Sequence, residues 1–168
     1  SFIDGKNGKL YYRGFNINEL ANNSTFEEVS YLLIHGKLPN KSQLNEITIW
    51  MSNNRNIPIE VINLIDSIKH LHPMDVLRTA ISTLAAFDDS LDDDSMDSNV
   101  KKGLSITTKA PTIVTAHVRL RDGKDPISPE KSLSHASNFL YMLFGVIPDE
   151  LDAKLLDKDL ILHAEHGL

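Results

Sequence analysis

Two histidines and a carboxylate stand close together near the end of the sequence, at His163, Glu165 and His166. Imidazole changes charge near neutral pH, so such a cluster suits acid–base chemistry or hydrogen bonding to a reacting oxygen. We expect both histidines on neighbouring faces of a last, mainly buried helix. Burial lowers the pKa of an imidazole and keeps it neutral, as a catalytic hydrogen-bond donor requires. The structural alternative is that both rings bond to backbone groups in the core or at the helix end.

These residues do not form a common metal motif. His163-Ala164-Glu165 matches the H-x-E of zinc deaminases, but the chain has no cysteine to complete that site. The H-E-x-x-H motif of zincins does not occur, and the acidic run 88–94 lacks the glycine and glutamate of an EF-hand. We therefore expect no metal, and we expect residues 88–94 to form a surface loop.

Composition narrows the remaining functions. The net charge of -6 and the pI of about 5.6 argue against a nucleic-acid partner. No apolar run is long enough for a membrane span, and the first residues lack the features of a signal peptide. With no cysteine for disulfides, a cytoplasmic location is expected. G-x-S-x-G, P-loop and G-x-G-x-x-G motifs are missing, so hydrolase, NTPase and dinucleotide-binding functions have no anchor.

The elements that position the histidines are predicted to be mainly α-helical. Residues 1–14 have the pattern of a β-hairpin, with turn residues between two short apolar runs. Residues 15–168 are helical in period, which predicts an all-α fold. Helices are expected from Thr25, at a capping box, to Gly36; after Asn40 to about Ser52; from Pro58; from Met74 to about Phe87; from about Met96 to Leu120, with Pro111 kinking it or marking a bend; from Leu133 to Phe144; and from Asp149 onward.

The other histidines have structural explanations. His72 precedes Pro73 and is expected to cap a helix or face water, and His35 stands at a helix end. His117 is expected on a helix surface. His135 begins the penultimate helix and could point toward the same cleft as His166.

Four segments, in order along the whole chain, resemble the citrate synthase family. They are the hairpin Ile3-Asp4-Gly5-Lys6-Asn7-Gly8-Lys9-Leu10-Tyr11-Tyr12-Arg13-Gly14-Phe15, the helix from Thr25 through Leu33 with its exit Gly36-Lys37-Leu38-Pro39, the stretch His72-Pro73-Met74-Asp75-Val76-Leu77-Arg78-Thr79-Ala80, and the final Leu160-Ile161-Leu162-His163-Ala164-Glu165-His166. Family members are considerably longer. The resemblance therefore implies that residues 1–168 are the N-terminal part of the large domain, without the small domain and the C-terminal part.

The resemblance implies an almost all-helical homodimer that condenses acetyl-CoA with oxaloacetate to citrate and CoA. Propionyl-CoA replaces acetyl-CoA in the 2-methylcitrate branch. The CoA thioester is a substrate, and no bound cofactor is expected. The helix from Met74 to Phe87 resembles one at the family's dimer interface.

The resemblance also implies residue roles. His166 matches the catalytic histidine that donates a hydrogen bond to the thioester oxygen and stabilises the enol. His135 lies in a segment near the oxaloacetate site and is a candidate substrate-binding residue; His163 is a supporting one, often Tyr in the family. The base Asp, the second catalytic histidine and the arginines would follow Leu168. Position 167 is usually Glu in the family, with Gly as a less common variant, and Gly167 is expected to loosen the helix end. The 168-residue chain alone is thus predicted to be inactive.

Two alternatives remain open. The chain could be a non-catalytic helical interaction module that binds a partner through bare apolar helix faces. It could also be the related citryl-CoA-cleaving domain of a citrate lyase, which would need an ATP-grasp partner that the sequence does not show.

Overall fold

The computed structural model describes residues 1–165, and the catalytic assignment of His166 falls outside the described residues. The chain opens with a small antiparallel sheet of β1 (Phe2–Asp4), β2 (Lys9–Tyr12) and β3 (Phe15–Asn16). Tyr12 pairs with Phe15 across a two-residue turn in which Arg13 and Gly14 both have positive φ, at 50° and 90°. That backbone matches the twist of the strands, so the turn closes tightly. The predicted hairpin is confirmed, with β3 as an additional strand.

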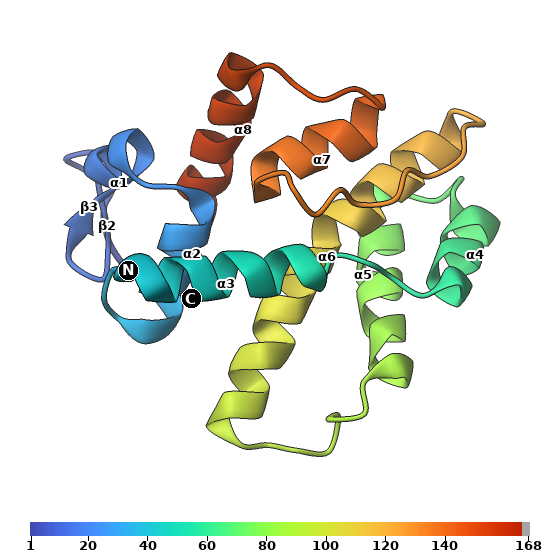
Figure 1. Ribbon diagram of the computed structural model, residues 1–168, viewed down its shortest axis with the longest axis horizontal. Helices are drawn as coiled ribbons and strands as arrows, with labels where there is room; N and C mark the ends of the chain where they lie inside the picture. The colour runs from blue at the N-terminus through green and yellow to red at the C-terminus, as the bar shows by residue number, and fades with distance from the viewer. Residues whose placement is uncertain (166–168) are drawn as a thin grey trace. The chain divides into compact units, whose positions relative to one another are not determined.

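Outside this sheet, the regular secondary structure of residues 1–165 is helical, which confirms the predicted fold class (Figure 1). The helices are α1 (Ile17–Asn23), α2 (Phe26–His35), α3 (Lys41–Asn53), α4 (Ile59–Ile68), α5 (Pro73–Leu84) with the 3-10 turn η1 (Ala85–Phe87), α6 (Met96–Arg121), α7 (His135–Phe144) and α8 (Glu150–Leu162). α6 runs through Pro111 without a break in the helix.

Local signals explain where several helices start. The Thr25 hydroxyl accepts the Glu28 N–H, and the Glu28 carboxylate accepts the Thr25 N–H, which confirms the capping box. The His72 imidazole Nδ1 accepts the Met74 N–H, so of the two alternatives expected for His72 the structure shows the helix cap, at the start of α5. Gly36 closes α2 in the left-handed conformation that glycine tolerates best.

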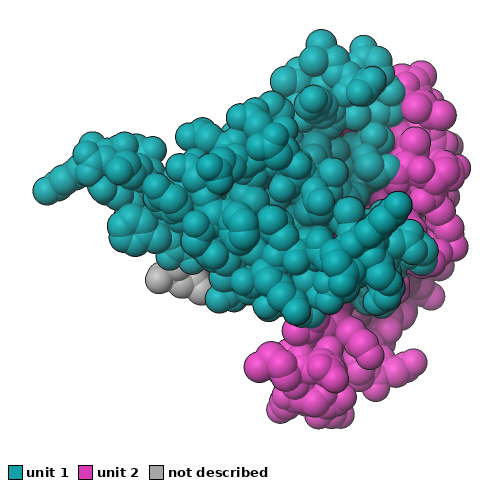
Figure 2. Space-filling model, turned by 60° about the vertical axis from the view of Figure 1, so that its left-hand side comes forward, with its two compact units in different colours: residues 1–50, 134–137, 148–168 teal, residues 51–133, 138–147 magenta. Residues whose placement is uncertain are grey.

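The chain divides into two compact units (Figure 2). Unit 1 comprises residues 1–50, 134–137 and 148 onward, and unit 2 comprises residues 51–133 and 138–147. In unit 1, α1 and α2 pack against α8, and the fully buried side chains include Tyr12, Val29, Leu32 and Ile161.

Unit 2 is built around α4, α5 and α6, which all contact one another. Its core consists of small and branched apolar side chains: Val61, Ile65, Val76, Ala80, Ile113 and Ala116. His117 is 4% exposed, and its Nε2 lies 3.0 Å from the Lys69 carbonyl oxygen just after α4. The prediction that His117 lies on a helix surface is therefore wrong, because its ring bonds to the end of the neighbouring helix.

Candidate active-site segment

His163, the first histidine of the candidate segment, follows α8 and is not part of it. α8 ends at Leu162, and His163 is its C-cap, with its N–H on the Asp159 carbonyl oxygen at 3.1 Å. The Ala164 N–H then bonds to the Ile161 carbonyl oxygen at 3.3 Å, in the tighter pattern common at helix ends. The prediction that His163 lies within the last helix is wrong, and the same prediction for His166 falls outside the described residues.

Tyr12 provides the physical reason for this helix end. Its hydroxyl donates to the Leu162 carbonyl oxygen at 3.1 Å and accepts the Glu165 N–H at 3.3 Å. The Glu165 N–H is therefore satisfied by a side chain from β2 and not by Ile161, the acceptor that a continuing helix would use. A residue far away in the sequence sets the direction of the chain as it leaves α8.

His163 itself is exposed, with 75% of its side chain accessible. Its Nδ1 lies 2.8 Å from the Asp159 carbonyl oxygen and 3.5 Å from the Asp159 carboxylate. The expectation of a mainly buried last helix is wrong for this face, since Leu155 and Leu162 are 58% and 46% exposed while Ile161 is fully buried. The role of His163 as a supporting substrate residue stays a prediction.

His135 is the opposite case, with only 2% of the residue exposed. Its backbone N–H, at the start of α7, donates to the Glu27 carboxylate at 2.9 Å. Its ring stacks on Phe26 with centroids 4.9 Å apart and an interplanar angle of 22°. Both contacts come from the first turn of α2, so α2 fixes the place and the plane of this imidazole. Its predicted role in oxaloacetate binding is not tested by these contacts.

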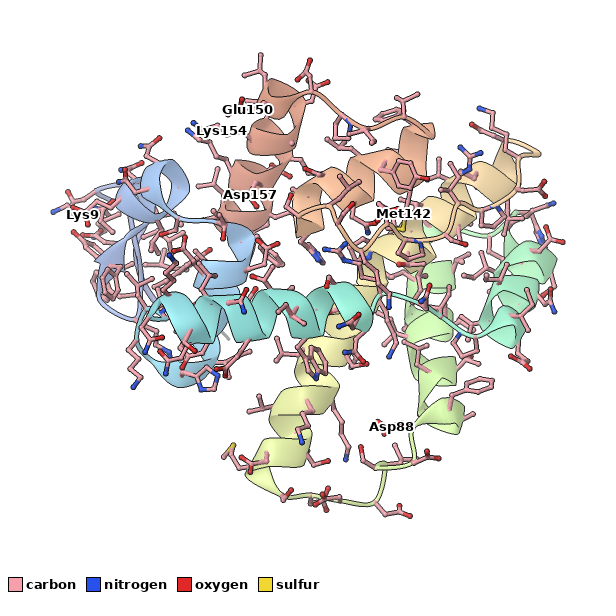
Figure 3. All side chains as sticks on the ribbon, viewed as in Figure 1. Lys9, Asp88, Met142, Glu150, Lys154 and Asp157 are labelled. Carbon is pink, nitrogen blue, oxygen red and sulfur yellow. The ribbon has the colours of Figure 1, made fainter. Side chains whose placement is uncertain are left out.

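A half-buried carboxyl on α8 completes this arrangement. Asp157 lies on α8 (Figure 3), and its carboxylate accepts the Phe26 N–H at 3.1 Å. Burial raises the pKa of Asp157 to about 6, and the nearby carboxylates of Glu27 and Glu28 act in the same direction, while the Phe26 N–H opposes them. α8 thus holds the start of α2, which in turn holds His135.

Sequence reasoning missed Tyr12, Glu27 and Asp157. Glu27 is 4% exposed, and nothing about its type marked it as buried. Asp157 had a usable signal, because it stands four residues from both Ala153 and Ile161 and so interrupts an apolar stripe with a carboxyl. For Tyr12 the only signal was an aromatic hydroxyl in a short strand, since such a group needs a partner when it is buried.

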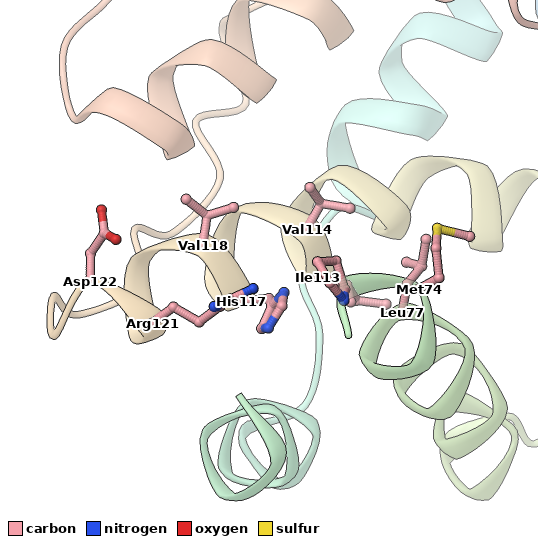
Figure 4. Close-up of a pocket in the computed structure, with 9 residues that line it drawn as sticks. Met74, Leu77, Ile113, Val114, His117, Val118, Arg121 and Asp122 are labelled. Carbon is pink, nitrogen blue, oxygen red and sulfur yellow. The ribbon is translucent and has the colours of Figure 1, made fainter. Parts of the chain in front are cut away.

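Unit 2 carries a separate surface pocket of about 460 Å³ between α5 and α6. Figure 4 shows Met74 and Leu77 toward one end of it and Arg121 and Asp122 toward the other. The lining is mostly apolar: Pro73, Met74, Leu77, Ile113, Val114, His117, Val118, Arg121 and Asp122. Since Met74 is 62% exposed and Val118 38%, this face presents apolar side chains to solvent.

Among residues 1–165, no three histidine, aspartate or glutamate side chains are grouped so that they could hold a metal ion. Nor does this part of the chain contain a helix with the length and apolarity to cross a membrane.

The chain as a whole is similar to known proteins of one family. The family description "Citrate synthase, C-terminal domain" matches residues 1–168. The chain is 40% identical over 173 residues to the citrate synthase of Haloferax volcanii, covering 100% of this chain and 46% of that protein. It is 32% identical over 169 residues to the citrate/2-methylcitrate synthase of Bacillus subtilis, covering 100% of this chain and 45% of that protein.

A solved structure agrees with these relatives. The crystal structure of citrate synthase from Pyrobaculum aerophilum superposes with a TM-score of 0.89 at 36% identity, over 95% of this chain and 42% of that one. The chain thus spans less than half the length of the relatives it matches. Because both the sequence match and the fold match extend over nearly all of its length, the chain belongs to the citrate synthase family.

Proposed function

We propose that the full-length protein carrying this chain is an acyltransferase that condenses acetyl-CoA with oxaloacetate to give citrate and CoA. The observation that carries the proposal is the match of all 168 residues to the family, including the segment with His163, Glu165 and His166. The two hydrogen bonds of the Tyr12 hydroxyl, to Leu162 and Glu165, fix the path of the chain after α8. They support the proposal because the residues of an active site must be held in a defined position.

In this proposal His166 acts on the thioester oxygen. Removal of a proton from the carbon beside the thioester moves negative charge onto that oxygen, and an imidazole N–H in place beforehand stabilises it. A carboxylate base, a second histidine and the arginines that hold oxaloacetate would come from sequence after Leu168. The enol carbon then attacks the ketone of oxaloacetate, and hydrolysis of the thioester releases CoA. His135 is proposed to line the oxaloacetate site.

A thiol-release assay on the full-length protein tests the activity. CoA release should require both oxaloacetate and an acyl-CoA, and comparing acetyl-CoA with propionyl-CoA separates a citrate synthase from a 2-methylcitrate synthase. Substitution His166→Ala should lower kcat by about 10²-fold or more, as loss of an oxyanion donor does. His70→Ala, which removes an exposed imidazole in unit 2, is the control. Absence of thiol release from the unsubstituted protein would refute the proposal.

The 168-residue chain alone is proposed to be inactive. The groups of such a site act as a unit, so a hydrogen-bond donor without its base loses most of the rate enhancement. Citrate formation by the purified chain would contradict this. A non-catalytic interaction module is not favoured, since the relatives that the chain matches are named as enzymes.

We also propose that the α5–α6 face binds a second copy of the protein, giving a homodimer. Its exposed Met74 and Val118 beside an apolar pocket support this. Met74→Lys should shift the protein toward monomer in light scattering after gel filtration. Met96→Lys is the matched control, because Met96 is 77% exposed but does not line the pocket. Equal masses for both variants and the unsubstituted protein would contradict this interface.

A further inference from the structure

The hydroxyl of Tyr12 joins the N-terminal sheet to the segment that follows α8. Tyr12 is fully buried, and its hydroxyl contacts the Leu162 carbonyl oxygen and the Glu165 N–H at 3.1 and 3.3 Å. These two backbone groups bracket His163 and Ala164, and Glu165 directly precedes His166. One side chain therefore holds the chain on both sides of a short turn.

The small sheet and α2 both hold the backbone around Tyr12. Its strand is paired on both sides, with Tyr11 opposite Phe2 and Tyr12 opposite Phe15. The next residue, Arg13, donates two hydrogen bonds to the Leu33 carbonyl oxygen at the end of α2, at 3.1 and 2.8 Å. The sheet and α2 therefore fix the position of the Tyr12 ring, and through it the position of the hydroxyl.

The chemistry of the group suits this role. A phenol hydroxyl donates one hydrogen bond and accepts another, so it satisfies a carbonyl oxygen and an N–H at the same time. Burial, together with the nearby Glu165 carboxylate, raises the pKa of Tyr12 above its usual value. The hydroxyl therefore keeps its proton at neutral pH and can always donate to Leu162.

We infer that Tyr12 is a positioning residue for His166: its hydroxyl sets the direction of residues 163–165 and so determines where the imidazole of the following residue meets the acyl thioester. The inference rests on the proposed function. Tyr12 itself takes no part in the chemistry, and it acts through the backbone at Leu162 and Glu165. Displacement of a catalytic group by about 1 Å is enough to cost up to a hundredfold in rate.

Tyr12→Phe in the full-length protein tests this inference, because it removes only the hydroxyl. We expect kcat to fall about tenfold or more while KM for both substrates stays within about twofold, the pattern of an interaction needed in the transition state. Hydrogen exchange followed by mass spectrometry should speed up in peptides covering residues 160–168. Tyr11→Phe removes a hydroxyl from the adjacent residue of the same strand and should leave kcat and exchange unchanged.

Results that differ from these expectations would overturn the inference about Tyr12. If the unsubstituted protein is active and His166→Ala is not, but Tyr12→Phe keeps full kcat, the inference is overturned and the proposed function stands. It is also overturned if Tyr12→Phe is unfolded at the assay temperature, or loses kcat only in proportion to its folded fraction by circular dichroism. An inactive unsubstituted protein would overturn the proposed function, and this inference with it.

Discussion

The half-buried carboxyl of Asp157 makes a definite prediction about stability and pH. Burial raises its pKa to about 6 from the ordinary 3.8, with the carboxylates of Glu27 and Glu28 contributing in the same direction. The folded protein therefore binds this proton more tightly than the unfolded chain does. The stability that Asp157 contributes is fully present below about pH 4 and is lost as the pH rises through about 6.

Substitution Asp157→Asn removes the charge but keeps a carbonyl oxygen that can accept the Phe26 N–H. The difference between the folded-state pKa of about 6 and the ordinary 3.8 sets an upper limit of about 3 kcal/mol on the stability that the protein loses when Asp157 ionises. Because Asp157 is only half-buried, solvent screening reduces this, and we expect about 1 kcal/mol. We therefore compare the free energy of unfolding of the variant with that of the unsubstituted protein at two pH values. The difference, variant minus unsubstituted, should be about 1 kcal/mol larger near pH 7 than near pH 4.

Urea unfolding of both proteins, followed by circular dichroism at several pH values between about 4 and 8, measures this difference. Asp92→Asn, in an exposed loop of unit 2, controls for the change in net charge. A variant whose free energy of unfolding runs parallel to that of the unsubstituted protein over the whole range would refute the reasoning. It would mean that the Phe26 N–H fully offsets the burial of the carboxylate.

Three further predictions concern the packing and are tested by urea unfolding at neutral pH. Thr25→Ala removes the capping box of α2 and should lower the free energy of unfolding by about 1 kcal/mol, whereas Thr25→Ser should keep most of that stability. Equal stability of the two variants and the unsubstituted protein would exclude the cap as a contributor. Arg55→Met should lower the free energy of unfolding by about 2 kcal/mol or more, because the buried guanidinium donates to the Glu130 and Leu133 carbonyl oxygens at 2.7 and 2.9 Å. A loss below about 0.5 kcal/mol would contradict this. Ile113→Ala should cost about 2–5 kcal/mol and Ile113→Val clearly less, since this side chain is fully buried between helices; a reversed order would contradict close packing there.

Most helices were predictable because their signals are local. Thr25 and Glu28 cap α2 from within four residues, and His72 and Pro73 open α5 in the same way. These groups are near one another in any conformation of the chain, so the sequence shows them directly. The family resemblance was equally visible, because its motifs are short runs of neighbouring residues.

The features that position the candidate site were not predictable in this way. Tyr12 and Leu162 are 150 residues apart, and Phe26 and Asp157 are 131 apart. No pattern in either segment points to the other, so the end of α8 and the raised pKa of Asp157 required the folded chain. The burial of His117 has the same origin, because its partner Lys69 belongs to another segment of unit 2.

The amino-acid sequence by itself determined the helical class, most helix starts and the candidate residues His135, His163 and His166, because these depend on periodicity, caps and short motifs. Only the tertiary structure decided that His163 is exposed and that His135 is held by α2. It also decided that the Tyr12 hydroxyl bonds to the backbone of Leu162 and Glu165 where the chain leaves α8. The physical reason is that burial and long-range hydrogen bonds belong to pairs of segments, and a pair exists only once the chain has folded.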